Sequence, residues 1–175
     1  MITQKKIPVF PLVLANSFGT LPYLSLGMVA AYLRRHDDSA LLDHYQVERL
    51  QLGGVEGHPI ENIYAQLEAA SQPVCLLSSY VWNHQLNMKA AQAIKEHCPS
   101  ALIIIGGPEI PKYVGETESF MNDNPAIDIA VLGEGEAACA EILSKLSTAD
   151  LTSQGLLEGV TGIVYRSGDA LFRTG

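Results

Sequence analysis

The stretch 101-ALIIIGGPEIP-111 decides the fold of this chain. Leu102 to Ile105 are all apolar and mostly β-branched, which is typical of a strand that helices cover on both faces, as in a parallel sheet. Gly106 and Gly107 then leave the carboxyl end of the strand without side chains, and this is the end where open α/β sheets bind ligands. The glycine pair has two interpretations: a notch that admits a bulky ligand, or a tight turn that requires positive φ.

The rest of the chain repeats the unit of a strand followed by a helix. Further apolar runs predict strands at 7–14, 39–47, 73–77 and 127–132. Helical spacing of apolar residues predicts helices near 22–35, 59–70, 84–97, 114–121 and 135–146. This alternation predicts an α/β fold with a doubly wound, five-stranded parallel sheet flanked by helices. Near the end, residues 160–165 and 170–173 flank a Ser-Gly-Asp turn and predict a C-terminal β-hairpin outside the repeat.

Composition limits the class of protein. The chain has 175 residues, 47% of them hydrophobic and 17% charged, which is typical of a globular domain. A net charge of −8 argues against a nucleic-acid or membrane surface, because both require clustered Lys and Arg. The three cysteines have no C-x-x-C spacing, which indicates reduced thiols rather than disulfides or a metal site. Without an apolar run of about eighteen residues or a signal peptide, we expect a soluble cytoplasmic protein.

The loops that follow parallel strands meet at one edge of the sheet, so we expect them to form the binding site. They contain no P-loop, no dinucleotide-binding glycine motif and no nucleophile elbow, which favours a large ligand held by backbone over catalysis by this chain. No metal ligand is predicted. The candidate binding residues are Asn16, Ser17, Ser78, Ser79, Tyr80, Trp82, Asn83, Gly106, Gly107, Pro108, Glu109, Gly133, Glu134 and Gly135.

Several of these residues also have a structural interpretation. Glu134 and Glu136 could form a carboxylate pair for acid–base chemistry, but acidic residues at a helix start more often interact with the helix dipole. Tyr80 and Asn83 could donate hydrogen bonds to ligand amides or could pack the end of a strand. Glu109 could contact the ligand or face solvent.

Three segments, in this order and spacing, resemble the amino-terminal cobalamin-binding domain of cobalamin-dependent radical S-adenosylmethionine (SAM) enzymes. They are 77-LSSYVWN-83, 105-IGGPE-109 and 128-DIAVLGEGE-136. Leu21-Pro22 and 162-GIVYR-166 are also similar, so the resemblance covers nearly the whole chain. It implies a Rossmann-like, cobalamin-binding domain over residues 1–150. Residues 151–175 would then be a hairpin or linker toward a radical SAM domain of the same polypeptide.

The resemblance also implies how cobalamin is held. Its nucleotide tail would contact Ser78, Ser79 and the Gly106-Gly107 turn, and its corrin would lie over the loops after the first and third strands. Cobalamin domains such as that of methionine synthase supply a cobalt-binding histidine from a D-x-H-x-x-G loop, but residues 16–20 contain no histidine. The Asp43-His44 pair lacks the intervening residue and follows the predicted second strand, so we do not expect it to bind cobalt.

We therefore expect base-off, His-off cobalamin, as methylcobalamin, with Trp82 covering its lower face. The other interpretation of Trp82 is a core or helix-capping aromatic. The C-x-x-x-C-x-x-C motif that binds the 4Fe-4S cluster of radical SAM enzymes is absent, so the resemblance implies that this chain is one part of a longer methyltransferase. SAM, the cluster and the substrate radical would belong to another domain. The alternative is a stand-alone, flavodoxin-like sensor domain that binds a flavin or a nucleotide.

Overall fold

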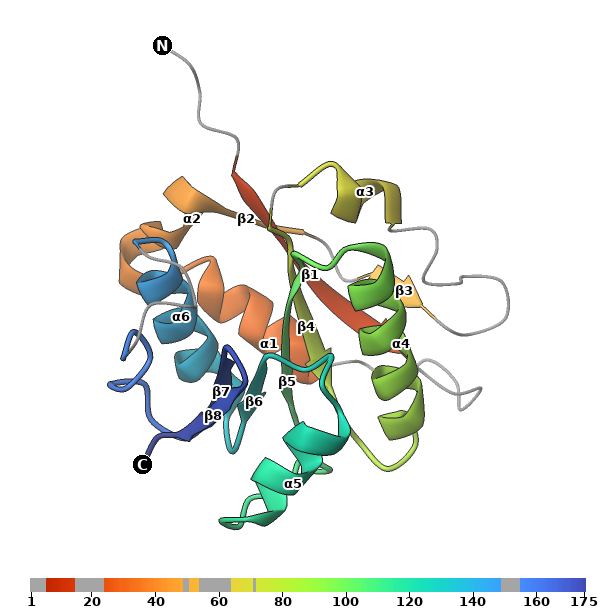
Figure 1. Cartoon of the computed structure of the whole chain (residues 1–175). Coiled ribbons are helices and arrows are strands. Elements are labelled where there is room, and N and C mark those ends of the chain that lie inside the picture. The colour runs from red at the N-terminus through yellow and green to blue at the C-terminus, as the bar shows by residue number, and fades with distance from the viewer. Residues whose placement is uncertain (1–5, 15–23, 49–50, 54–63, 71, 149–154) are drawn as a thin grey trace.

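A computed structural model describes residues 6–14, 24–48, 51–53, 64–70, 72–148 and 155–175 (Figure 1). Its strands are β1 (Ile7–Leu14), β2 (Tyr45–Val47), β3 (Gln51–Gly53), β4 (Val74–Ser78), β5 (Leu102–Gly106), β6 (Ile129–Val131), β7 (Ile163–Ser167) and β8 (Ala170–Arg173). Its α-helices are α1 (Leu24–Leu33), α2 (Leu41–His44), α3 (Tyr64–Glu68), α4 (His84–His97), α5 (Glu116–Asp123) and α6 (Gly135–Leu146). None of these described helices is long and apolar enough to cross a membrane.

The described strands form one sheet in the order β2-β1-β4-β5-β6-β7-β8, with β3 also paired to β1. The pairs from β2 to β6 are all parallel. Two short strands, β2 and β3, pair with the first and last thirds of β1 and together take the place of one strand. The parallel part therefore has the order second, first, third, fourth, fifth, which is a doubly wound topology. The predicted fold class is confirmed.

The second predicted strand, 39–47, was placed too early. Its first half forms the short helix α2, and β2 begins only at Tyr45. Before α2, Asp37 and Asp38 have φ angles of 46° and 49°, left-handed values that aspartate tolerates better than most residues and that break an extended chain. The apolar run at 40–42 is too short to distinguish a strand from one helical turn. His44 therefore precedes its strand and lies at the amino edge of the sheet.

The predicted C-terminal hairpin is present and extends the sheet. β7 runs antiparallel to β6, with Ile129 opposite Tyr165 and Val131 opposite Ile163. β8 continues antiparallel beside β7. Ile163 and Tyr165 are buried, so the hairpin contributes to the core as well as to the edge of the sheet.

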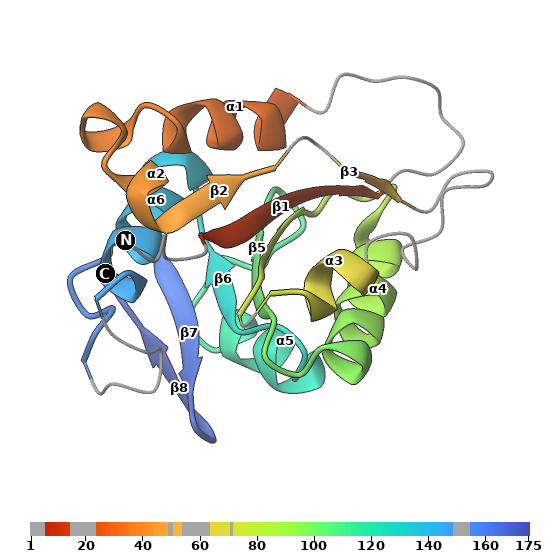
Figure 2. The ribbon, with the colours of Figure 1, turned by 90° about the horizontal axis from the view of Figure 1, so that it is seen from above.

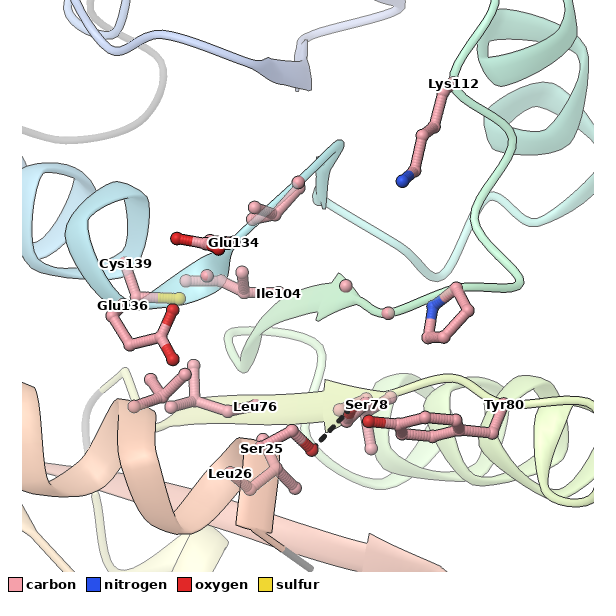
Figure 3. Close-up of a pocket in the computed structure, with 18 residues that line it drawn as sticks. Ser25, Leu26, Leu76, Ser78, Tyr80, Ile104, Lys112, Glu134, Glu136 and Cys139 are labelled. Atoms are coloured by element: carbon pink, nitrogen blue, oxygen red, sulfur yellow. Dashed lines mark hydrogen bonds between the residues drawn. The ribbon is translucent and has the colours of Figure 1, made fainter.

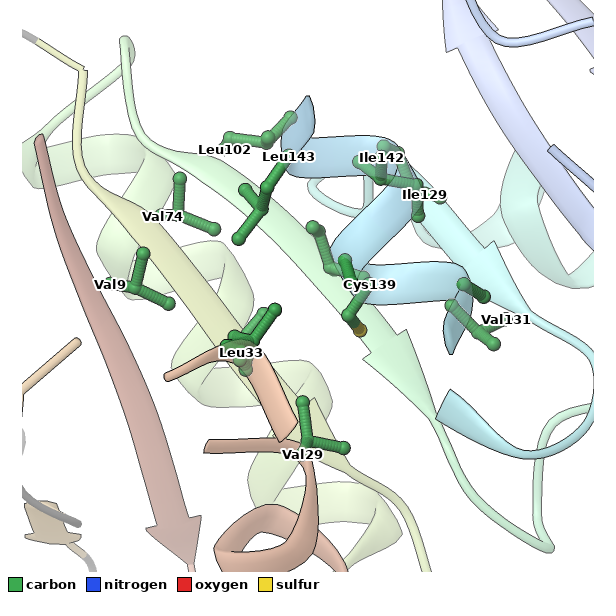
Figure 4. Packing of buried hydrophobic residues seen from close by; sticks show 14 of the residues in the cluster. Val9, Val29, Leu33, Val74, Leu102, Ile129, Val131, Cys139, Ile142 and Leu143 are labelled. Atoms are coloured by element: carbon green, nitrogen blue, oxygen red, sulfur yellow. The ribbon is translucent and has the colours of Figure 1, made fainter. Parts of the chain in front are cut away.

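Helices cover both faces of the sheet (Figure 2). α1 and α6 pack on one face, where Val29, Leu33 and Leu143 contact the central strands (Figure 4). α3, α4 and α5 supply buried residues to the core on the other face, including Leu67 and Ile94. Two hydrophobic layers therefore enclose the sheet, as its nearly continuous apolar strands require.

The helices depart from the sequence predictions in two ways. In α1 the helical spacing of Leu24, Met28, Ala31 and Tyr32 in the sequence predicts that these four residues form the apolar face. The structure instead buries Leu26, Val29, Ala30 and Leu33. Both sets have helical spacing because almost every residue of α1 is apolar, so periodicity alone does not select a face. The predicted first turn of the 59–70 helix lies outside the described residues.

α4 matches its predicted bounds, but one residue of its inner face was missed. Helical spacing in the sequence predicts an inner face of Leu86, Ala90, Ile94 and His97. Ala90 and Ile94 are buried accordingly, and Asn87 is buried with them. His97, also expected inside, instead pairs with Glu68 and stacks on the ring of Tyr64. The sheet-facing side of α4 therefore includes a polar group near its amino end.

Candidate functional site

A cavity of about 410 Å³ opens at the carboxyl edge of the sheet, between α1 and α6 (Figure 3). Leu76, Ile104 and Val131 from three adjacent parallel strands line its inner part, and all three are buried. Leu26 of α1 and Cys139 of α6 line it from the helices. The strand ends and the helix pair thus form an apolar slot, the usual setting for a small-molecule or cofactor group.

Most of the predicted binding residues meet at this cavity. The loops after β4, β5 and β6 converge there, as expected for parallel strands. The predicted residues that line it are Ser78, Tyr80, Gly106, Gly107, Pro108, Gly133, Glu134 and Gly135. Asn16 and Ser17 lie outside the described residues.

Two further predicted residues, Ser79 and Asn83, lie in the loop after β4 but do not line the cavity. The Oγ of Ser79 is 2.9 Å from Nδ1 of His84, and the whole residue is buried. Asn83 accepts a hydrogen bond from the Tyr80 amide at 2.7 Å and donates one to the Ser78 carbonyl at 3.0 Å. Both side chains therefore fold the loop onto itself, which favours the strand-end interpretation of Asn83.

Trp82 and Glu109 lie in the same loops, outside the cavity lining. The ring of Trp82 stacks on that of Tyr80, with centroids 4.7 Å apart and planes 11° from parallel. Trp82 is 40% exposed, so it is not a core residue. The Glu109 side chain is exposed, and its amide donates a hydrogen bond to the Ser79 carbonyl. The aromatic pair thus joins the cavity lining, through Tyr80, to the exposed loop surface.

The two glycines of the 101–111 stretch have different roles. Gly107 has φ of +108°, and a Cβ there would lie 2.4 Å from the Ser79 carbonyl oxygen. Its missing side chain is thus required by the turn and by the neighbouring backbone. At Gly106 a Cβ would make ordinary contact with Val131 at 3.5 Å. Gly106 lies two residues after Ile104 along β5 and so shares its face of the sheet. It therefore faces the cavity, and its missing side chain leaves space there.

Sequence reasoning missed several lining residues. Ser25, Leu26 and Val29 come from α1, whose inner face was assigned incorrectly. The Oγ atoms of Ser25 and Ser78 lie 3.0 Å apart, which ties the start of α1 to the end of β4. Lys112 comes from the loop after β5, and only its position shortly after a strand end could have indicated it.

The charges at the cavity belong to Lys112, Glu134 and Glu136. Glu134 occupies the N-cap position of α6 and Glu136 lies in its first turn, where the helix dipole favours negative charge. Burial, with a smaller contribution from Glu136, raises the pKa of the Cys139 thiol to about 12. Burial thus favours the neutral thiol form of Cys139.

Within the described residues, no group of three or more His, Cys, Asp or Glu side chains could hold a metal ion. The described part of the site therefore offers shape, backbone and a few charges for binding.

Comparison with known proteins confirms the resemblance found in the sequence. No family model matches the chain. A cobalamin-dependent radical SAM methyltransferase, TokK of Streptomyces tokunonensis, is 41% identical over 71 residues, which are 41% of this chain and 10% of TokK. The 2-(S-pantetheinyl)-carbapenam-3-carboxylate methyltransferase of Streptantibioticus cattleyicolor is 43% identical over 70 residues, 40% of this chain and 10% of that enzyme. The match thus spans about a tenth of the length of these relatives.

A solved structure has the same fold over almost the whole chain. The cobalamin-dependent SAM radical enzyme OxsB, with aqua-cobalamin bound, superposes with a TM-score of 0.64. The superposition covers 96% of this chain and 22% of OxsB, at 23% sequence identity. This level of identity supports the likeness of fold, and the curated relatives support the kinship with radical SAM enzymes.

Proposed function

We propose that this chain is the cobalamin-binding domain of a cobalamin-dependent radical SAM methyltransferase, and that its cavity holds the nucleotide tail of the cofactor. The observation that carries the proposal is the apolar slot at the carboxyl edge, in a chain whose curated relatives are methyltransferases of this kind. Leu76, Ile104 and Val131 offer an apolar surface to the base of the tail. Gly106 leaves room beside that surface, and the Ser78 hydroxyl lies at its edge.

The corrin ring would lie over the outer loops, in the base-off, His-off state. The positions of the histidines support this part of the proposal. No histidine lines the described cavity, and residues 15–23 contain none in the sequence. His84 is engaged by Ser79, and His44 lies at the opposite edge of the sheet. Trp82, supported by its stacking on Tyr80, would cover the lower face of the corrin.

The residues of this chain would bind and orient the cofactor and would not themselves be catalytic. Bound methylcobalamin supplies a methyl group for transfer to a substrate carbon radical. We place the formation of that radical, with SAM and the 4Fe-4S cluster, in a separate domain of the same cytoplasmic polypeptide. Residues 151–175 would form the connection to that domain, with the hairpin β7–β8 docked on the sheet.

A second candidate function is a stand-alone sensor domain that binds a flavin or a nucleotide. The observation in its favour is the strand order, which flavodoxin-like proteins share. To separate the two functions, the purified chain is incubated with hydroxocobalamin or with flavin mononucleotide, freed of excess ligand, and examined by visible spectroscopy. We expect corrin absorbance to remain with the protein. Retained flavin without retained corrin would overturn the proposal in favour of the sensor.

The variant Gly106→Val tests where the cofactor binds. A branched side chain suits a β-strand and fits beside Val131, but it would project into the slot. We expect Gly106→Val to lose corrin retention and Gly106→Ala to keep part of it, with urea unfolding curves close to that of the wild type. Full retention by the valine variant would exclude this cavity as the tail site.

A further inference from the structure

Lys112 is the only positively charged side chain among the described residues that line the cavity. In Figure 3 it extends from the loop after β5 toward the open space of the cavity, with its ammonium group leading. Its side chain is exposed, and the ammonium makes no hydrogen bond or ion pair within the described part of the chain. Lys112 is therefore available to an incoming group.

The loop that carries Lys112 is fixed by the C-terminal hairpin. Arg173 of β8 donates from Nε to Oε1 of Glu118 at 2.7 Å, and from Nη2 to the Tyr113 carbonyl at 3.1 Å. Its Nη1 lies 3.4 Å from the carbonyl oxygen of Lys112 itself. A planar guanidinium suits this arrangement because its donors point in fixed directions. Arg173 thus holds the backbone at Lys112 and at the next residue.

Helix α5 holds the same loop from the other side. The Thr117 hydroxyl, which is buried, donates to the Pro111 carbonyl at 2.6 Å and accepts from Nη2 of Arg173 at 2.7 Å. Oε2 of Glu118 accepts a hydrogen bond from the Gly115 amide at 2.6 Å. The backbone around Lys112 is therefore fixed before any ligand arrives, and only the lysine side chain has to be ordered on binding.

The negative charge of the nucleotide tail indicates what Lys112 would bind. The tail of cobalamin contains one phosphodiester, which carries one negative charge. The chain has a net charge of −8, and two carboxylates line the cavity, so an anion that enters meets repulsion unless a cation is near. We infer that Lys112 is the cationic contact for this phosphodiester and that Arg173 positions the loop that presents it. The inference rests on the proposed function and adds the residue that recognises the charged part of the ligand.

The test is a spectroscopic titration of the whole chain with hydroxocobalamin. We expect Lys112→Met to raise the Kd about tenfold, as for loss of a hydrogen bond to a charged group. Lys112→Arg keeps the charge and should remain within about threefold of the wild type. Lys89→Met removes an exposed lysine of α4 that does not line the cavity, and it should bind like the wild type. Salt should weaken binding by the wild type more than by Lys112→Met.

Phosphorus NMR reads the contact directly, because cobalamin contains a single phosphorus atom. We expect its bound resonance to differ between the wild type and Lys112→Met. An unchanged Kd, or an unchanged resonance, in Lys112→Met would overturn the inference while leaving cobalamin binding intact. Failure of the wild type to bind cobalamin would instead overturn the proposed function.

The role of Arg173 is tested through Lys112. Arg173→Met should raise the Kd for cobalamin in the wild-type background but should not raise it further in the Lys112→Met background. The reason is that Arg173 acts by positioning Lys112. An equal loss of cobalamin affinity in both backgrounds would show that Arg173 has a general structural role, and it would overturn the assignment of Arg173 as a positioning residue. Glu118→Gln removes the negative charge that pairs with Arg173 and keeps a side chain of similar shape. It should therefore give the same comparison with a smaller change to the packing. Arg166→Met is the matched control, since Arg166 lies in the same hairpin but donates to Met121 of α5 instead of the loop.

Discussion

The two faces of the sheet differ at its carboxyl edge. On the face covered by α4 and α5, buried polar side chains close the edge: Asn83 and Asn87 both donate to the Ser78 carbonyl, at 3.0 and 3.1 Å. On the face covered by α1 and α6, the strand ends are lined by apolar side chains and glycines, and a cavity remains. We call the face covered by α4 and α5 the closed side of this edge, and the face covered by α1 and α6 its open side.

This difference separates two kinds of residue that look alike in a sequence. Asn83 and Ser79 have the side chains expected of ligand donors, yet their hydrogen bonds are used within the protein. Gly106 and Gly133 have no side chains, yet they line the cavity. Rigidity of the closed side would hold the open side in shape for a ligand.

The largest expected effect comes from adding a methyl group at two glycines of the cavity lining. At Gly107 it would meet the Ser79 backbone of the closed side, and at Gly133 it would enter open space. Gly107→Ala forces a Cβ to within 2.4 Å of the Ser79 carbonyl at a positive φ, and we expect it to lower the free energy of unfolding by about 3 kcal/mol. At Gly133 a Cβ would meet nothing within 4 Å, so Gly133→Ala should change the free energy of unfolding by less than about 1 kcal/mol. Urea denaturation measures both. Similar losses would show that the two sides are equally closed.

A smaller effect is expected from removing one polar side chain on each side. Asn83→Ala leaves the Tyr80 amide and one acceptor site of Ser78 without this partner, which should cost about 2 kcal/mol of unfolding free energy. Ser25→Ala, at the cavity, removes a single hydroxyl contact and should cost about 0.5 kcal/mol. Thermal unfolding of the two variants compares them. If Ser25→Ala were the more damaging, the cavity side would be the structural one.

The smallest expected effect is a pH dependence confined to the closed side. The hydrogen bond from Arg173 is the main cause that lowers the pKa of Glu118 from 4.5 to about 2. Because the pKa is lower in the folded state, Glu118 stabilises the fold above about pH 4.5 and loses this effect as the pH falls toward 2. The stability difference between the wild type and Glu118→Gln should therefore shrink over that range. A difference that stays constant from pH 7 to pH 3 would contradict the assignment.

The sequence allowed the fold to be predicted where local signals agreed. The strand predicted at 102–105 extends by one residue to Gly106, and the helices predicted near 84–97 and 135–146 match the bounds of α4 and α6. Apolar runs and glycine or proline mark the ends of these elements in the sequence. The inner face of α1 was not predictable, since its apolar residues satisfy two faces and only packing against α6 and the sheet selects one. Most lining loops were predicted from topology. Lys112 was not, because its place at the cavity depends on hydrogen bonds from Arg173, distant in the sequence.

Strand β1 has a consequence for how the chain folds during synthesis. Val9 pairs with Val47 on one side and with Val74 on the other, and Leu12 pairs with Gln51 and Leu77. None of these partners has left the ribosome when β1 emerges, and contacts so distant in the sequence form slowly. On the β4 side, the apolar residues Val9, Phe10 and Leu12 therefore lack their partners Val74, Cys75 and Leu77 until β4 has been translated. Strand β1 is thus completed late relative to its own synthesis, and this interval is when its apolar residues are most exposed to aggregation or to capture by a chaperone.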